Sequence, residues 1–104
     1  MLLTLKHFRK TVTTAGTRIQ LTTNEVNVVY LIIQALTGNT GRIYIGNNQV
    51  ASTSSFVDLA PDSSISLDSA QLGLGDAKLD MSKIWLDSSV SGEGVNVGYI
   101  EVQG

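Results

Sequence analysis

The stretch from Asn27 to Gly46 constrains the fold more than any other part of the chain. Residues 28–36 are almost all apolar and rich in β-branched and aromatic side chains, which suit a buried pleated surface. Such a run can also be a buried helix, but this one is short and ends in a Gly-Asn-Thr-Gly turn at 38–41. Residues 42–45 then alternate polar and apolar side chains. The pattern predicts a β-hairpin whose central strand is buried on both faces and whose partner has a more hydrated face.

Six other segments are also typical of short strands, because their side chains alternate or are rich in β-branched residues. They are residues 11–13, 18–21, 56–59, 64–68, 83–87 and 95–102. With the hairpin, this predicts an all-β fold: an antiparallel β-sandwich or jelly roll of about eight short strands, formed by residues 11–104. Two packed sheets are favoured over one open sheet, which would leave a face bare. Residues 69–77 are the least regular part and could form one helical turn or a loop.

The alternating runs also predict which side chains form the core. Twelve lie on the apolar side of such runs: Ile19, Leu21, Leu31, Ile33, Ile43, Ile45, Ile65, Leu67, Ile84, Leu86, Val97 and Tyr99. A second set points away from that face: Val28, Tyr30, Ile32, Tyr44, Trp85, Ile100 and Val102. A sandwich of 104 residues has little with which to cover the second set. We therefore expect a homo-oligomer, preferably a trimer.

Residues 1–10 are predicted to form an N-terminal arm outside the sandwich. The segment is too apolar for a free tail and too charged for the core; its candidate partner-binding residues are Leu3, Leu5, Lys6, Phe8, Arg9 and Lys10. Such an arm would be poorly ordered or swapped until it docks on a partner. The alternative is a frayed chain end. Its few basic side chains, without interleaved aromatic residues, do not indicate nucleic-acid binding.

Charge is unevenly distributed along the chain, although the net charge is only −2. Residues 1–50 contain five basic residues and one acidic residue, whereas residues 51–104 contain two basic and eight acidic residues. The two halves could interleave in the sandwich, so that the asymmetry vanishes in space. Alternatively, a basic arm and an acidic rim pair head-to-tail between copies, because complementary potentials set register and association rate.

The sequence offers little chemistry, and we expect a protein that is not an enzyme and needs no cofactor. There is no cysteine. A serine nucleophile needs a base nearby to activate it, and the single histidine, His7, lies in the arm. Asp76, Asp80 and Asp87 are close enough in sequence to suggest calcium, but the twelve-residue pattern of calcium ligands is not present. The favoured interpretation is that they cap turns, and no metal site is expected. No apolar run approaches the roughly 20 residues of a membrane span, and no signal peptide is apparent.

The aromatic residues are the remaining candidates for a binding surface. Tyr30, Tyr44 and Trp85 are candidates for an oligomer interface, since exposed aromatic side chains mark binding surfaces. Together with Tyr99 they could instead form a platform on which a sugar stacks. An interface is favoured over a sugar, because no cluster of Asn, Asp or Arg accompanies them at fixed spacing in the sequence.

Three segments, taken in order, resemble small β-sandwich structural proteins of tailed bacteriophage virions. They are Thr-Val-Thr-Thr-Ala-Gly-Thr-Arg-Ile-Gln-Leu (11–21), Ile-Gln-Ala-Leu-Thr-Gly-Asn-Thr-Gly-Arg-Ile-Tyr-Ile-Gly (33–46), and Lys-Ile-Trp-Leu-Asp (83–87) with Gly-Glu-Gly-Val (92–95). The resemblance covers most of residues 11–102, without residues 69–80. It implies a non-enzymatic virion component, and no binding residues carry over, because the shared motifs are structural.

Two functions follow as expectations. The first is a capsid decoration (cement) protein that stabilises the head shell of a phage by binding the major capsid protein or another virion protein. Such a protein would be assembled in the host cytoplasm, and the arm favours this role because it could reach across joints in the shell. The second is a carbohydrate- or receptor-binding module of a phage tail or tail accessory protein. Neither expectation involves nucleic acid or a membrane.

Overall fold

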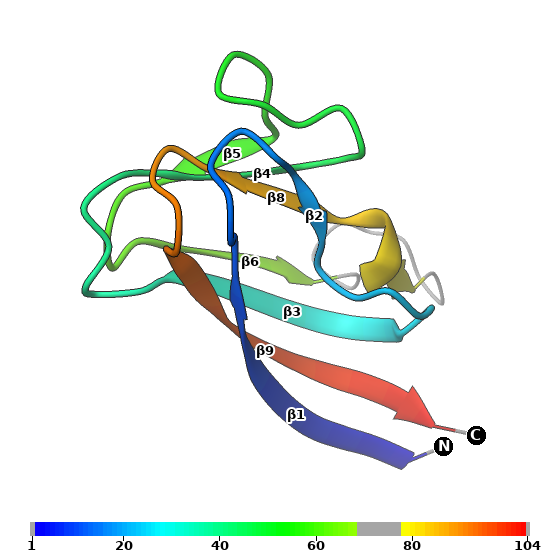
Figure 1. Cartoon of the computed structure of the whole chain (residues 1–104). Coiled ribbons are helices and arrows are strands. Elements are labelled where there is room, and N and C mark those ends of the chain that lie inside the picture. Colours follow the sequence, from blue (N-terminus) through cyan, green and yellow to red (C-terminus); the bar gives the residue numbers. More distant parts are fainter. Residues whose placement is uncertain (1, 69–77, 104) are drawn as a thin grey trace.

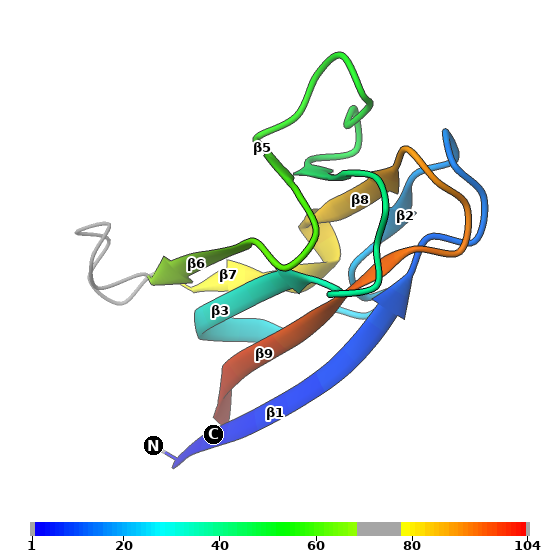
Figure 2. The ribbon, with the colours of Figure 1, turned by 90° about the vertical axis from the view of Figure 1, so that its left-hand side faces the viewer.

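Two antiparallel sheets pack face to face in the computed structural model, which describes residues 2–68 and 78–103 (Figure 1). Sheet A contains, in order, β1 (Leu2–Thr11), β9 (Gly94–Gln103), β3 (Asn27–Ala35) and β6 (Ser64–Asp68), and β7 (Leu79–Asp80) also pairs with β3. Sheet B contains, in order, β2 (Ile19–Gln20), β8 (Trp85–Ser88), β4 (Ile43–Gly46) and β5 (Val57–Leu59). A short 3-10 turn, η1 (Met81–Lys83), links β7 to β8. The protein is thus an all-β sandwich, as predicted, and Figure 2 shows its two layers.

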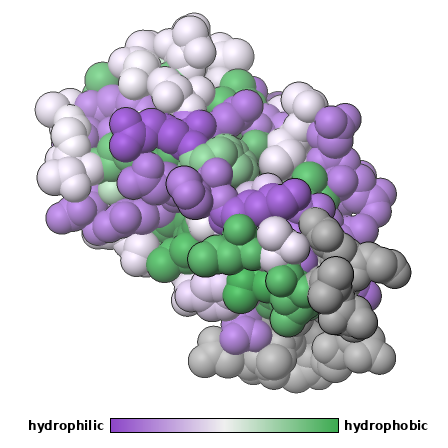
Figure 3. Space-filling model, turned by 90° about the horizontal axis from the view of Figure 1, so that it is seen from below, coloured by the Kyte–Doolittle hydropathy of each residue, from purple (hydrophilic) through white to green (hydrophobic). Residues whose placement is uncertain are grey.

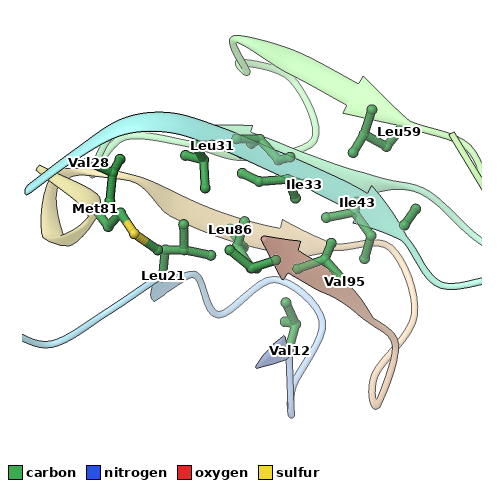
Figure 4. Close-up of a cluster of buried hydrophobic side chains, with 13 residues drawn as sticks. Val12, Leu21, Val28, Leu31, Ile33, Ile43, Leu59, Met81, Leu86 and Val95 are labelled. Atoms are coloured by element: carbon green, nitrogen blue, oxygen red, sulfur yellow. The ribbon is translucent and has the colours of Figure 1, made fainter. Parts of the chain in front are cut away.

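The core lies between the sheets and contains all twelve of the predicted side chains. Figure 4 shows its buried members. Seven of the twelve are buried, and Ile19, Ile65, Leu67, Ile84 and Tyr99 are half-buried and pack against them. Six buried members were not predicted: Val12, Val28, Ala35, Leu59, Met81 and Val95. Most of these lie in turns or at strand ends, where alternation gives no signal.

The predicted hairpin is wrong, because its two strands belong to different sheets. β3 pairs with β9, β6 and β7 in sheet A, whereas β4 pairs with β5 and β8 in sheet B. Residues 36–42 therefore cross from one sheet to the other. Asn39 is buried in this crossing, donating from Nδ2 to the backbone oxygen of Gly94 at 2.9 Å. This bond ties the crossing to the start of β9.

β3 also differs from the expected strand with two buried faces. Its inner side chains are buried, but the others are half-exposed. Val28 was expected to face outward and is instead fully buried. The pairing of β3 with β9 shifts between Val28 and Tyr30, which marks a β-bulge. A bulge inserts one residue and reverses the alternation, so Val28 and Leu31 both face the core in spite of their odd spacing.

Residues 2–10 are not an unpaired arm. They belong to β1, which pairs with β9 in unbroken register from Leu2↔Gln103 to Thr11↔Gly94. The physical reason is that an extended strand can pair its backbone with β9 and still divide its side chains between two faces: Phe8 packs against the core, while Leu3 and Leu5 lie on the opposite face.

The ion pairs Lys6–Glu101 and Arg42–Asp58 join the basic first half of the chain to the acidic second half. Lys6 Nζ lies 2.8 Å from Glu101 Oε2, and Arg42 lies 3.6 Å from Asp58. For these residues the two halves of the chain interleave within one molecule, which agrees with the first interpretation of the charge pattern.

Residues 69–77, for which a helical turn or a loop was expected, lie outside the described residues. Asp76 and the side chain of Val102 lie outside them as well.

Candidate functional surfaces

Strand β1 divides its six candidate partner-binding residues between two faces. Leu3, Leu5 and Arg9 lie on the outer face of sheet A, turned away from sheet B. Leu3 is 58% exposed and Leu5 is 76% exposed. Lys6, Phe8 and Lys10 lie on the inner face by strand alternation. The six side chains therefore cannot bind one flat partner surface together.

Two of the inner-face residues, Phe8 and Lys6, are engaged within the chain. The ring of Phe8 packs edge-on against Tyr99, with the centroids 6.0 Å apart. Lys6 donates a hydrogen bond to the Glu101 carboxylate. This bond, together with the negative charge of the carboxylate, raises the pKa of the Lys6 ammonium above its ordinary value. Phe8 and Lys6 thus fasten β1 to β9. On the outer face, Arg9 Nε donates to Asn96 Oδ1 at 3.3 Å.

Apolar side chains continue from β1 across the outer face of sheet A. Leu5 pairs with Ile100, which pairs in turn with Tyr30, so the three form a row across three strands. Ile32 lies in the next row, opposite Gly98, where a Cβ would come within 3.2 Å of the Ile32 side chain. We call Leu3, Leu5, Tyr30, Ile32 and Ile100 the sheet A patch. On the sheet A side of the molecule, hydrophobic side chains gather in a band bordered by hydrophilic ones (Figure 3).

The three aromatic candidates for an oligomer interface do not lie together. Tyr30 is on the outer face of sheet A, whereas Tyr44 and Trp85 are on the outer face of sheet B, because their neighbours Ile45 and Leu86 face the core. All three are half-exposed. The sheet A patch can include Tyr30 but neither of the other two.

Trp85 lies at the centre of a polar region on the outer face of sheet B. In the sheet it is flanked by Gln20 of β2 and Gly46 of β4. Val50 folds back over Gly46, where an added Cβ would lie 3.2 Å from the Val50 side chain. This fold-back sets residues 47–49 beside Trp85. Their turn is held by Asn47, whose Oδ1 accepts from Gln49 N at 2.8 Å and whose backbone oxygen accepts from Val50 N at 3.0 Å.

A second loop, residues 13–18, approaches Trp85 from the side of β2. It is held by Asp87, which is only 4% exposed and accepts from Gly16 N at 2.9 Å and from Ser88 N at 2.7 Å. Gly16 adopts φ +86, a conformation that favours glycine. Asp87 therefore holds the loop that forms one wall of the region around Trp85. Its Oδ1, which accepts both hydrogen bonds, is not free to bind a ligand.

The two loops leave an open cleft on each side of Trp85. The larger has a volume of about 520 Å³ and is lined by Gly16, Thr17, Arg18, Asn48, Gln49 and Trp85. The smaller, of about 310 Å³, is lined by Gln20, Asn47, Asn48, Ser82, Lys83 and Trp85. Sequence spacing did not indicate this cluster of amides and cations, because its members come from three distant segments. The Asn-Asn-Gln run at 47–49 was the available signal.

Among the carboxylates considered for calcium, both described members cap local structure. Asp80 Oδ1 accepts from Ser82 N and Oγ, and these bonds lower the pKa of Asp80 below its ordinary value. Asp87 holds the 13–18 loop as described above. Within residues 2–68 and 78–103, no three or more His, Asp and Glu side chains are grouped so that they could hold a metal ion.

No protein-family model matches the chain, and no curated protein matches it. In the part of the chain that the structure describes, no helix has the length and apolar character needed to cross a membrane.

Proposed function

We propose that this chain is a non-enzymatic structural protein of a tailed-phage virion, a capsid decoration protein that forms a homo-oligomer, preferably a trimer. The sequence resemblance suggests the virion, and the exposed sheet A patch is the observation that supports a docking role. Its partners would be further copies of the chain and the major capsid protein or another virion protein.

The patch is suited to docking because its apolar side chains are adjacent and accessible. Leu3 and Leu5 are more than half exposed, and Ile100 and Tyr30 extend the row of Leu5 inward over the sheet. Covering apolar surface contributes about 25 cal/mol for each Å² removed from water. A monomer gains nothing from exposing two neighbouring leucines, whereas a partner surface would bury both.

Strand β1 adds a second favourable feature, because it is an edge of sheet A. An edge strand presents backbone groups that can pair with another chain. Arg9, which lies on the same outer face as Leu3 and Leu5, would favour an acidic partner surface. Exposed ion pairs contribute little, so we expect most of the affinity to come from apolar burial, with modest sensitivity to salt.

The test is binding to virions that lack the protein. Leu3→Ser combined with Leu5→Ser should leave the fold intact and weaken binding and self-association. Val90→Ser, which changes another exposed apolar side chain in a turn, is the matched control and should bind as the parent does. If the double variant saturates the particles at the same concentration as the parent, the sheet A patch is not the docking surface. If the parent protein binds no virion component, the decoration role is wrong.

A receptor- or carbohydrate-binding module of a phage tail is the second candidate, favoured by the two clefts beside Trp85. Stoichiometry separates the two roles. A decoration protein should be present in many copies over the head shell, and a tail module in a few copies at one end. Electron microscopy of virions carrying the labelled protein measures this directly.

A further inference from the structure

We propose that the clefts flanking Trp85 form a binding site for an acidic oligosaccharide. This deepens the second candidate function in naming a ligand class, but the site would serve on a head as well as on a tail. It lies on sheet B, opposite the sheet A patch, so a docked molecule could present it outward.

The first argument is the combination of an aromatic side chain with planar amides. A pyranose ring has an apolar face of C–H groups and a rim of hydroxyls. A half-exposed indole can cover the apolar face, while an amide can both donate to and accept from neighbouring hydroxyls. Trp85 is flanked by Gln20 and Asn47 on one side and by Gln49 on the other, with Asn48 lining both clefts. Aromatic residues with a few placed polar groups are typical of ligand sites.

The second argument is that the site is already held in shape. Gln20 Nε2 donates to the backbone oxygen of Ser82 at 3.1 Å, which orients this amide. The Asn47 turn is closed by two hydrogen bonds, and Asp87 holds the 13–18 loop by way of Gly16. Affinity improves when the groups that contact a ligand lose little freedom on binding. These contacts restrict the groups in the free protein, so that less conformational entropy is lost when a sugar binds.

The third argument concerns charge and length. Arg18 lines the larger cleft and Lys83 the smaller one, and no carboxylate is among the described residues that line either. An Arg guanidinium matches the geometry of a carboxylate. The clefts lie on both sides of Trp85, and each is open, which suits a chain of sugars that crosses the indole. The ligand is therefore an oligosaccharide that carries carboxylates, such as a uronate or a sialate.

The experiment uses the full chain and its single tryptophan as the reporter. Trp85 fluorescence is titrated at constant ionic strength with tri-galacturonate, with sialyllactose and with the neutral maltotriose. We expect a saturable change with at least one acidic probe and weaker binding of maltotriose. No saturable change with any probe up to about 10 mM, a range that includes very weak ligands, would overturn the site. Tighter binding of maltotriose would overturn the acidic preference.

Variants locate the binding. Arg18→Ala should reduce the affinity for the acidic probe by about tenfold, the usual effect of losing a hydrogen bond to a charged group, and leave maltotriose unaffected. Gln49→Ala should weaken both. Arg42→Ala is the matched control, because Arg42 is also exposed but pairs with Asp58 and lines neither cleft. Unchanged acidic binding in Arg18→Ala and Gln49→Ala would overturn the assignment to these clefts.

The result of the sugar-binding experiment is independent of the result of the virion-binding experiment. The Leu3→Ser and Leu5→Ser changes lie on sheet A and should leave sugar binding unchanged, while Arg18→Ala should leave virion binding unchanged. Loss of sugar binding in the sheet A double variant, with an unchanged circular dichroism spectrum, would contradict the location on sheet B. Failure of either proposal would thus be visible without the other.

Discussion

Glu93 binds Thr40: its Oε2 accepts from Thr40 N at 2.6 Å and from Thr40 Oγ1 at 2.9 Å. Its other oxygen accepts from Gly41 N at 2.9 Å. The turn before β9 is thereby fastened to the crossing between β3 and β4. These donors, the Thr40 N–H first, lower the pKa of Glu93 below its ordinary value near 4.5. The Gly-Asn-Thr-Gly and Gly-Glu-Gly segments of the sequence meet at this contact.

The Glu93 contact should make stability depend on pH in the acid range. Because the folded pKa is below the unfolded value, the stabilisation is fully present above about pH 4.5 and is lost as pH falls through the folded pKa. Thermal unfolding followed by circular dichroism should show a lower midpoint for Glu93→Gln at pH 7. The difference from the parent should shrink below pH 4.5. Glu25→Gln, at an exposed position, is the control, and an equal effect there would exclude a special role for Glu93.

Ile33→Ala should lower the free energy of unfolding by about 2–5 kcal/mol, the usual cost of emptying a packed core site. Ile33 is 1% exposed between the sheets. Ile32→Ala is a matched control, because the same side chain at the next position faces outward and is only half-buried. Urea denaturation of both variants measures the difference, and equal losses would mean that the faces of β3 are wrongly assigned.

Gly94→Ala should destabilise the junction of β1 and β9. An added Cβ would collide with the backbone oxygen of Lys10 and the Cα of Thr11, and backbone atoms cannot move aside as a flexible side chain can. We expect a loss of about 1–3 kcal/mol, as for other overpacked sites. Gly38→Ala meets open space and should change stability by less than about 0.5 kcal/mol. Denaturant titration of the pair tests the register directly.

Deletion of residues 2–10 should destabilise the sandwich, in contrast to what an arm outside the fold would predict. The deletion uncovers the pairing edge of β9 and removes the contact of Phe8 with Tyr99. A lower unfolding midpoint or aggregation is expected, and the Leu3→Ser, Leu5→Ser double variant should show neither. A truncated protein with the parent's midpoint would mean that β1 contributes nothing to the fold.

The sequence alone determined the fold class and the main core. Alternation in segments such as 64–68 and 83–87 assigns each side chain to a face, because successive residues of a strand point in opposite directions. That local rule was sufficient for Ile33, Ile65 and Leu86, whose inward positions the structure confirms.

Only the tertiary structure decided which strands pair and which polar groups meet. Nothing local distinguishes a hairpin from a crossing between sheets, and the choice for residues 36–42 depends on bonds from Asn39 and Thr40 to a turn more than fifty residues away. The bulge before Tyr30 likewise depends on β9 as the partner strand. The clefts beside Trp85 are built from segments around residues 16–20, 46–49 and 82–85, which packing alone brings together. Strand alternation is a property of the local backbone, whereas a site of this kind exists only once the sheets and their loops are in place.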